Sequence, residues 1–185
     1  MPQVIPNRSY ETKRWKNGAG ITHEILAVPG PDTYAWRLSL AEVGRDGPFS
    51  QFDGMSRILT VIEGGGMSLV GPHETLQADL FSPVTFSGAL PITGVLNDEP
   101  IRNINLIFDS SRVSGAVQVL RYAMAKLQAG PDQTQVLYVA CGSALVADVQ
   151  ISGGDCALWR DEEALVKVAD DAVALLITVT GSDGT

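Results

Sequence analysis

The sequence predicts an all-β protein, built as a sandwich or a barrel. Apolar and β-branched runs recur at short intervals along the 185 residues, and several alternate apolar with polar side chains, as strands do. Clusters of glycine, proline, aspartate and asparagine separate these runs, for example at residues 29–32 and 152–155, and such clusters favour turns. Many short strands joined by frequent turns are typical of β-sandwiches and β-barrels.

Seven strands are expected, in the order of the chain. Trp36 to Val43 alternates apolar with smaller or polar residues, and the next two runs flank a glycine turn. The later runs are rich in β-branched residues, which favour strands. After Trp36 to Val43, the expected strands are Ile58 to Glu63, Met67 to Val70, Ile101 to Phe108, Val136 to Ala140, Ala144 to Ile151 and Ala172 to Val179.

Two stretches are ambiguous. Residues 115–128 begin like a strand, yet their apolar spacing also suits one face of a helix, and we favour a strand. Residues 162–168 are expected to form one helical turn or none.

A weak internal repeat indicates two similar β units. Ile58 to Gly64 resembles Val136 to Gly142, about 78 positions later, and each run ends in glycine and leads into another strand. We therefore expect an N-terminal barrel with the candidate pocket at residues 1–114 and a C-terminal barrel at 115–185. No long linker separates them, so the two barrels are expected to pack closely around one core.

Composition narrows the class of protein. A hydrophobic content of 45% is ample for a packed core, and a net charge of −8 argues against nucleic acid, whose phosphates require a basic face. No run approaches the roughly 18 to 20 apolar residues that span a bilayer, and the N-terminus has no signal pattern. We expect a cytoplasmic protein that binds no membrane.

Metal and thiol chemistry have little support in the sequence. The two histidines, His23 and His73, stand in no spacing typical of metal ligands, and each fits a surface or capping residue. Cys141 and Cys156 lie in apolar, strand-like surroundings without a neighbouring His or Lys, so both are expected to be buried, reduced and unreactive. We predict no metal and no cofactor.

Polar side chains inside the apolar strands form the main functional signal. Strand alternation puts Arg37 and Ser39 on one face, and Asn103 and Asn105 on one face of a later strand. Such faces are often merely solvated, but Arg, Ser and paired Asn offer the directional hydrogen bonds that suit a pocket. An arginine in such a pocket favours a carboxylate, because its planar fork makes two parallel hydrogen bonds.

The loops and the catalytic alternatives are less specific. Asn17 to Gly20 is a tight turn without the spacing of a phosphate-binding loop. In the turn at residues 46–50 and just after it, Phe49 and Phe52 are expected to pack as apolar anchors. No GxSxG turn supports a serine triad, whereas Glu24 would suit acid–base chemistry if it were buried beside Lys16 or Arg57.

These residues together resemble a known family. The succession Trp15-Lys16-Asn17-Gly18-x-Gly20-x-Thr22-x-Glu24-Ile25, then Trp36-Arg37-Leu38-Ser39-x-Ala41, then Asp46-Gly47-Pro48-Phe49-Ser50-x-Phe52-x-Gly54-x-x-Arg57 is similar to the HutD/Ves family of bacterial proteins. The resemblance is specific over this N-terminal block and weaker through Asn103-x-Asn105-Leu106. It implies a cupin-type double-stranded β-helix with two small barrel units in one chain.

The resemblance also implies a function and a site. Members of the family are associated with histidine utilisation, where they look like regulators that sense a pathway intermediate, with urocanate, formiminoglutamate and formylglutamate as plausible ligands. Asn103 stands where the family often has an aspartate, and the loss of that charge would alter ligand preference. The family motif, carried over to this chain, places at a ligand-binding pocket Lys16, Asn17, Thr22, Glu24, Arg37, Ser39, Arg57 and Asn105.

Three functions follow as hypotheses. The leading one is a metal-free, non-enzymatic protein that binds a small carboxylate, with Arg57 as the anion anchor. The second is a metal-independent isomerase or hydrolase of the same metabolites, with Glu24 or Lys16 transferring the proton. The third is a scaffold whose sheet surface recruits a partner, and an exposed strand edge would also support a homodimer.

Overall fold

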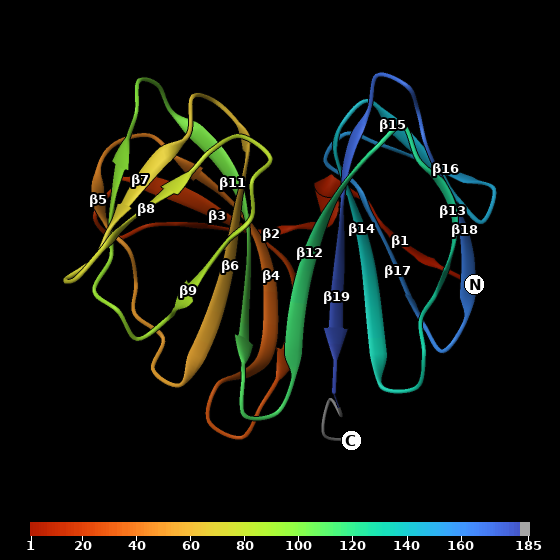
Figure 1. Ribbon diagram of the computed structural model, residues 1–185, viewed down its shortest axis with the longest axis horizontal. Coiled ribbons are helices and arrows are strands. Elements are labelled where there is room, and N and C mark those ends of the chain that lie inside the picture. Colours follow the sequence, from red (N-terminus) through yellow and green to blue (C-terminus); the bar gives the residue numbers. More distant parts are fainter. Residues whose placement is uncertain (182–185) are drawn as a thin grey trace. The chain divides into compact units, whose positions relative to one another are not determined.

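The computed structural model describes residues 1–181 and consists almost entirely of strands paired antiparallel (Figure 1). The prediction of an all-β chain is therefore confirmed. The chain divides into two compact units. We call Glu11–Val113 the middle unit, and Met1–Tyr10 together with the residues from Ser114 onward the terminal unit.

The middle unit contains a six-stranded and a four-stranded sheet. The larger sheet has the order β2 (Glu11–Arg14), β3 (Gly20–Pro29), β4 (Tyr34–Val43), β11 (Ile101–Asp109), β6 (Met55–Glu63) and β9 (Val84–Ser87). The smaller sheet has the order β5 (Gly47–Pro48), β10 (Thr93–Leu96), β7 (Met67–Val70) and β8 (Thr75–Ala78). Buried side chains of both sheets form one apolar core, in which Leu59 and Val61 cluster with Met67 and Leu69.

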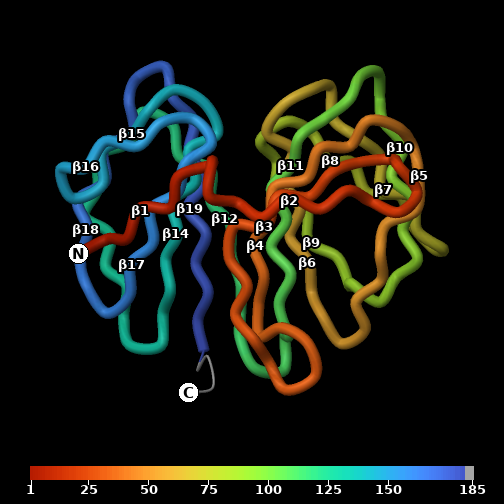
Figure 2. The backbone as a smooth tube through the Cα atoms, turned by 180° about the vertical axis from the view of Figure 1, so that it is seen from behind, coloured from red at the N-terminus to blue at the C-terminus, as the bar shows by residue number. Residues whose placement is uncertain are grey.

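The terminal unit has the same plan. Its larger sheet has the order β1 (Gln3–Ile5), β17 (Cys156–Arg160), β14 (Gln133–Cys141), β19 (Val173–Thr180) and β12 (Ser114–Arg121). Its smaller sheet has the order β13 (Met124–Gln128), β18 (Glu163–Val168), β15 (Ser143–Val146) and β16 (Val149–Ser152). A short 3-10 helix, η1 (Asn7–Ser9), follows β1, and Figure 2 shows β1 lying along β17.

The weak sequence repeat corresponds to a repeat of topology. Strands β4 to β11 of the middle unit and β12 to β19 of the terminal unit pair in the same way, one for one. Register shifts in β6 and β14 leave Ile62 and Ala140 unpaired with β11 and β19, respectively, and the glycines that follow, Gly64 and Gly142, both have positive φ, +93° and +73°. The two related β units predicted from sequence are thus observed, with their bulges at matching positions.

Some details of the prediction change. The expected single strand from Ala144 to Ile151 is wrong, because Ala147 and Asp148 adopt positive φ and turn the chain between β15 and β16. Residues 115–128 form two strands, β12 and β13, as favoured. Of the two alternatives for residues 162–168, no helical turn forms, and residues 163–168 are the strand β18.

The N-terminal ten residues differ from the predicted division into residues 1–114 and 115–185. They group with the terminal unit, because β1 pairs with β17. That the two units pack closely around one core stays a prediction. Within residues 1–181, no helix has the length and hydropathy needed to cross a membrane.

The two cysteines lie in different surroundings. Cys156 is fully buried in β17, and its Sγ lies 3.2 Å from the Tyr10 hydroxyl. Burial raises the pKa of the Cys156 thiol to about 12. Cys141 is also a free thiol but is exposed at the end of β14, so the expectation that both are buried is wrong for Cys141.

Thiol labelling should separate these two cysteines. With iodoacetamide at pH 8, we expect the native protein to be alkylated quickly only at Cys141, because the Cys156 thiol is buried and almost entirely protonated. Mass spectrometry would show one added group in the native state and two after unfolding. Rapid native labelling of a Cys141→Ser variant would contradict the burial of Cys156.

A second prediction concerns the glycine after the β6 bulge. A Cβ at Gly64 would lie 2.6 Å from the Pro100 carbonyl oxygen, at a φ of +93°. We expect Gly64→Ala to lower the free energy of unfolding by about 3 kcal/mol, since positive-φ strain and a backbone clash act together. Gly54→Ala is the matched control, with φ +73° and no atom within 4 Å of its Cβ, and should cost about 1 kcal/mol. If urea unfolding showed equal losses of unfolding free energy for Gly64→Ala and Gly54→Ala, the backbone clash at Gly64 would be contradicted.

Candidate functional site

One face of three adjacent strands carries the polar residues in rows. The register of β4, β11 and β6 places Arg37, Ile107 and Arg57 side by side across the sheet. Two residues further along β11, toward its N-terminal end, Asn105 lies between Ser39 and Leu59.

The row beyond that continues the same face. Asn103 lies between Ala41 of β4 and Val61 of β6, and Thr22 of β3 lies opposite Ala41. Guanidinium groups thus lie toward one end of the face, and an amide and a hydroxyl toward the other.

These rows border a cavity of about 470 Å³ in the middle unit. Seven of the eight predicted ligand-binding residues line it, namely Lys16, Asn17, Thr22, Arg37, Ser39, Arg57 and Asn105. Ser39, Arg57 and Asn105 are buried, so this face of the sheet is not merely solvated. The inward orientation that the alternation suggested is therefore observed, while ligand binding itself stays a prediction.

Arg57 is held in a cage of aromatic rings. Its guanidinium carbon lies 5.2, 5.7 and 5.0 Å from the ring centroids of Phe49, Phe52 and Phe86, respectively, within the range of cation–π attraction. The side chain is 4% exposed, and Nη1 donates a hydrogen bond of 3.2 Å to the Ser50 carbonyl. The rings and this carbonyl fix the position of the guanidinium. Phe49 and Phe52 therefore pack as expected from the sequence.

The charge of Arg57 has no acidic partner in the described chain. None of the ion pairs within residues 1–181 involves Arg57, and its buried Nε has no hydrogen-bond partner. Burial, with a smaller contribution from Arg37, lowers the pKa of Arg57 to about 10. The guanidinium thus remains charged at neutral pH but lacks a counter-anion.

Glu24 is the predicted residue that does not line the cavity. Its Oε2 accepts a 2.7 Å hydrogen bond from Arg37 Nε, in an ion pair whose side chains are 13% and 16% exposed. The prediction that Glu24 lines the pocket is therefore corrected, and its carboxylate pairs with Arg37 instead of Lys16 or Arg57, the partners that acid–base chemistry would have required. Its carboxylate neutralises Arg37, which leaves Arg57 as the unpaired cation of the row.

The two asparagines have unsatisfied polar atoms. Asn103 is 1% exposed, and neither its Nδ2 nor its Oδ1 has a hydrogen-bond partner within residues 1–181. The Oδ1 of Asn105, 8% exposed, is likewise without a partner. Asn103 was predicted to share a face with Asn105 but was not included among the pocket residues. The alternation that joined the two asparagines was the signal for it.

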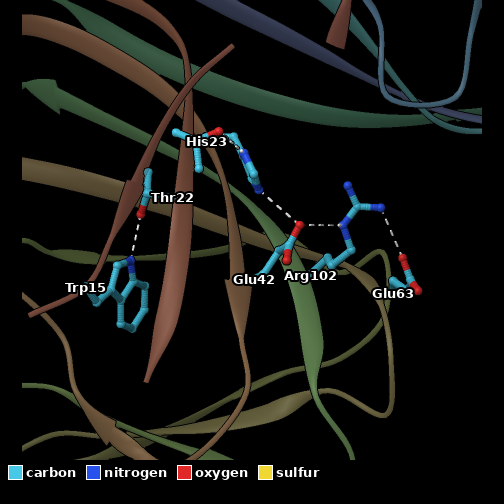
Figure 3. Close-up of polar contacts among 7 residues, drawn as sticks. Trp15, Thr22, His23, Glu42, Glu63 and Arg102 are labelled. Atoms are coloured by element: carbon cyan, nitrogen blue, oxygen red, sulfur yellow. Dashed lines mark hydrogen bonds and ion pairs between the residues drawn. The ribbon is translucent and has the colours of Figure 1, made fainter. Parts of the chain in front are cut away.

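Loop residues also border the cavity. Trp15 Nε1 donates a 2.7 Å hydrogen bond to Thr22 Oγ1 (Figure 3), and the Trp15 ring meets Phe49 edge to face at 6.0 Å. Asn17 Oδ1 accepts the Ala19 amide at 2.9 Å, which closes the turn before β3. Trp15 lines the pocket but was not among the predicted site residues, although it begins the family motif.

A second cavity, of about 480 Å³, borders Glu42, Glu63 and Arg102 in the same unit. Figure 3 shows these side chains in a row with His23, whose Nε2 lies 3.0 Å from Glu42 Oε1. Arg102 pairs with Glu63 at 3.3 Å. Because these partly exposed charges pair with one another, the first cavity is the stronger candidate for binding an anion. Within residues 1–181, no three His, Cys, Asp or Glu side chains cluster as metal ligands would.

The terminal unit offers an internal comparison. At the topological positions of Arg57, Asn105 and Asn103 it carries Gln135, Leu176 and Ala174. The repeated fold therefore does not by itself require the arginine or the two asparagines, although Gln135 is also buried and polar.

Comparisons with known proteins agree with the motif. The HutD family model matches residues 7–177. The chain is 36% identical over 119 residues to an uncharacterized 21.2 kDa protein in the hutC 3′ region of Pseudomonas putida, an alignment that spans 63% of each protein. Protein Ves of Citrobacter koseri is 27% identical over 175 residues, 92% of this chain and 90% of that one.

Solved structures share the fold. HutD from Pseudomonas fluorescens SBW25 superposes with a TM-score of 0.87 at 26% identity, over 98% of this chain and all of that one. YhhW from Escherichia coli, at 10% identity and a TM-score of 0.71 over 97% of both chains, shows the fold alone. The predicted cupin-type architecture is thereby confirmed.

The Arg37–Glu24 pair leads to a stability prediction. Glu24→Ala should lower the free energy of unfolding by about 3 kcal/mol, because it leaves a mostly buried guanidinium unpaired. Glu24→Gln should cost less, about 1 kcal/mol, since the amide oxygen still accepts the hydrogen bond.

The exposed pair Lys126–Glu163, at 3.0 Å, supplies the control. Glu163→Ala should change the free energy of unfolding by less than about 1 kcal/mol. Urea denaturation at pH 7 measures the free energy of unfolding of all three variants. Equal losses for Glu24→Ala and Glu163→Ala would show that the buried pair is not important for stability.

Proposed function

This chain belongs to the HutD family, and we propose that it binds a small carboxylate metabolite in the cavity of the middle unit. We further propose that it acts as a regulator linked to histidine utilisation. The hutC-region location of the Pseudomonas putida relative supports the second part.

A single observation supports the ligand class most directly. Arg57 is a charged guanidinium, nearly fully buried, borders the cavity, and pairs with no carboxylate in residues 1–181. Burial, with a smaller contribution from the charge of Arg37, lowers the pKa of Arg57 to about 10, which shows that the charged guanidinium is in an unfavourable environment. This cost is already present in the unliganded protein, so a carboxylate that pairs with Arg57 gains a favourable interaction.

Neighbouring groups support a small polar ligand. Lys16 adds positive charge at the cavity, while Ser39, Thr22 and Asn105 supply hydrogen-bonding groups along its wall. Urocanate, formiminoglutamate and formylglutamate all carry carboxylates and remain the preferred ligands. Because the carboxylate of Glu24 is bound by Arg37, the enzymatic alternative depends on Lys16, the other predicted acid–base residue, which borders the cavity.

Thermal shift measurements test the proposal. We expect at least one of these three compounds, at millimolar concentration, to raise the melting temperature of the protein. A ligand present at 100 times its Kd adds about 2.7 kcal/mol of stability. No stabilisation by any of them would count against binding, and consumption of a compound, followed by chromatography, would favour the enzymatic alternative.

A variant pair links the effect to Arg57. Arg57→Lys keeps the charge but loses the planar fork, so affinity for the stabilising compound should fall at least about tenfold. Arg112→Lys, at an exposed arginine, should leave affinity unchanged. In the wild type, affinity should be nearly constant from pH 7 to about 9 and fall as the pH rises through about 10, where Arg57 with its lowered pKa loses its proton.

A further inference from the structure

The second cavity of the middle unit combines an apolar surface with charges of both signs. Its volume of about 480 Å³ falls within the range of about 300–1,000 Å³ that is typical of small-molecule sites. Its apolar lining comes from three buried residues, Ala19, Val43 and Ile101, and from the partly buried Trp15 and Ile21. The cavity therefore has the size and the apolar surface that a small organic molecule requires.

Charged side chains border this surface in one row across the sheet. The register aligns Arg14 of β2 with Ile21 of β3, and Ile21 with Glu42 of β4. The same row continues to Arg102 of β11 and then to Glu63 of β6. All five residues line the cavity. The row thus begins with a cation, passes over an apolar residue, and ends in a group of three charges.

That group carries more negative than positive charge. Arg102 lies between the two carboxylates, 4.0 Å from Glu42 and 3.3 Å from Glu63 (Figure 3), so one guanidinium serves two carboxylates. His23 also contacts Glu42, at 3.0 Å, and adds charge only when it is protonated. The side chains of Glu42 and Glu63 are 44% and 65% exposed, so a ligand can reach both.

The charge of Arg14 is not used by an acidic side chain. None of the ion pairs within residues 1–181 involves Arg14, which is exposed at the end of β2. Two strand spacings separate its backbone from that of Glu42, roughly 10 Å at about 4.8 Å per strand. Ile21 lies between them, so one small ligand above Ile21 can contact both long side chains.

The sign of each charge narrows the class of ligand. A simple anion would be repelled by Glu42 and Glu63, and a simple cation would be repelled by Arg14. An uncharged ligand would pair with neither the free guanidinium nor the surplus carboxylate. A small molecule with one positive charge, one negative charge and an apolar body complements both charges and the apolar lining.

From these observations we infer that the second cavity binds the zwitterion of a free α-amino acid with an apolar side chain. Its ammonium group pairs with Glu42 and Glu63, and its carboxylate pairs with Arg14. The apolar side chain packs against Val43 and Ile101. An α-amino acid carries both charges on one carbon, so both fit between the two protein groups. This site is separate from the carboxylate site proposed above and does not depend on it.

Isothermal titration of the wild-type protein at pH 8 with three matched probes tests the inference. Leucine carries both charges, 4-methylpentanoate lacks the ammonium group, and 3-methylbutylamine lacks the carboxylate. We expect leucine to bind about fivefold more tightly than either, because each missing ion pair is partly exposed to solvent. This comparison needs no variant, so it does not depend on the folding of a substituted chain.

Two variants locate the effect. Glu63 lines the second cavity but not the first, and Glu63→Gln should reduce the preference for leucine over 4-methylpentanoate to less than twofold. Arg14→Gln should likewise remove the preference for leucine over 3-methylbutylamine. Glu74→Gln, at an exposed glutamate outside this cavity, is the matched control and should leave both preferences unchanged. A thermal melt confirms that each variant folds.

Each outcome bears on a different part of the inference. Affinities of the wild type for the three probes within twofold of one another, or no binding of leucine at millimolar concentration, would overturn it. A preference over 4-methylpentanoate that persists in folded Glu63→Gln, or that falls equally in Glu74→Gln, would overturn the assignment to the second cavity. The proposed function is decided separately, by thermal shifts with the three carboxylate metabolites.

Discussion

A buried guanidinium without an acidic partner among residues 1–181 is the constraint that organises the middle unit. Such a group is tolerated only where its position is fixed and its charge partly compensated, and three phenylalanine rings and the Ser50 carbonyl do both for Arg57. These rings come from the turn after β5 and from β9, so both segments contact the Arg57 guanidinium as well as the apolar core. The cavity remains open beside it.

The antiparallel register places further rows of polar side chains on the same face as Arg57. Because side chains alternate with a period of two, each step of two residues along β11 brings a new row to the same face. The rows progress from guanidinium groups to Asn105 and then to Asn103. The terminal unit repeats the topology with Gln135, Leu176 and Ala174 at these positions, so the same fold forms without the arginine and the two asparagines.

The sequence predicted most residues of the candidate site but not which charged side chains pair with one another. Alternation of polar residues in two strands, with the motif around Trp15 and Arg57, predicted seven of the residues that line the cavity. Glu24 obeys the same alternation, yet it pairs with Arg37 from the neighbouring strand. No local pattern shows which of two arginines receives a carboxylate, since that depends on how strands far apart in the chain align.

Local chemistry in the sequence alone determined the all-β class, six of the seven predicted strands, the duplication of a β unit and the residues suited to an anion, because periodicity, turn residues and side-chain type act over a few positions. Only the tertiary structure decided the pairing of β1 with β17 and the exposure of Cys141 against the burial of Cys156. It also decided that, within the part of the chain the structure describes, Arg57 has no acidic partner and the Asn103 amide has no hydrogen bond. Each of these depends on contacts between segments distant in sequence, and register and burial are properties of such contacts.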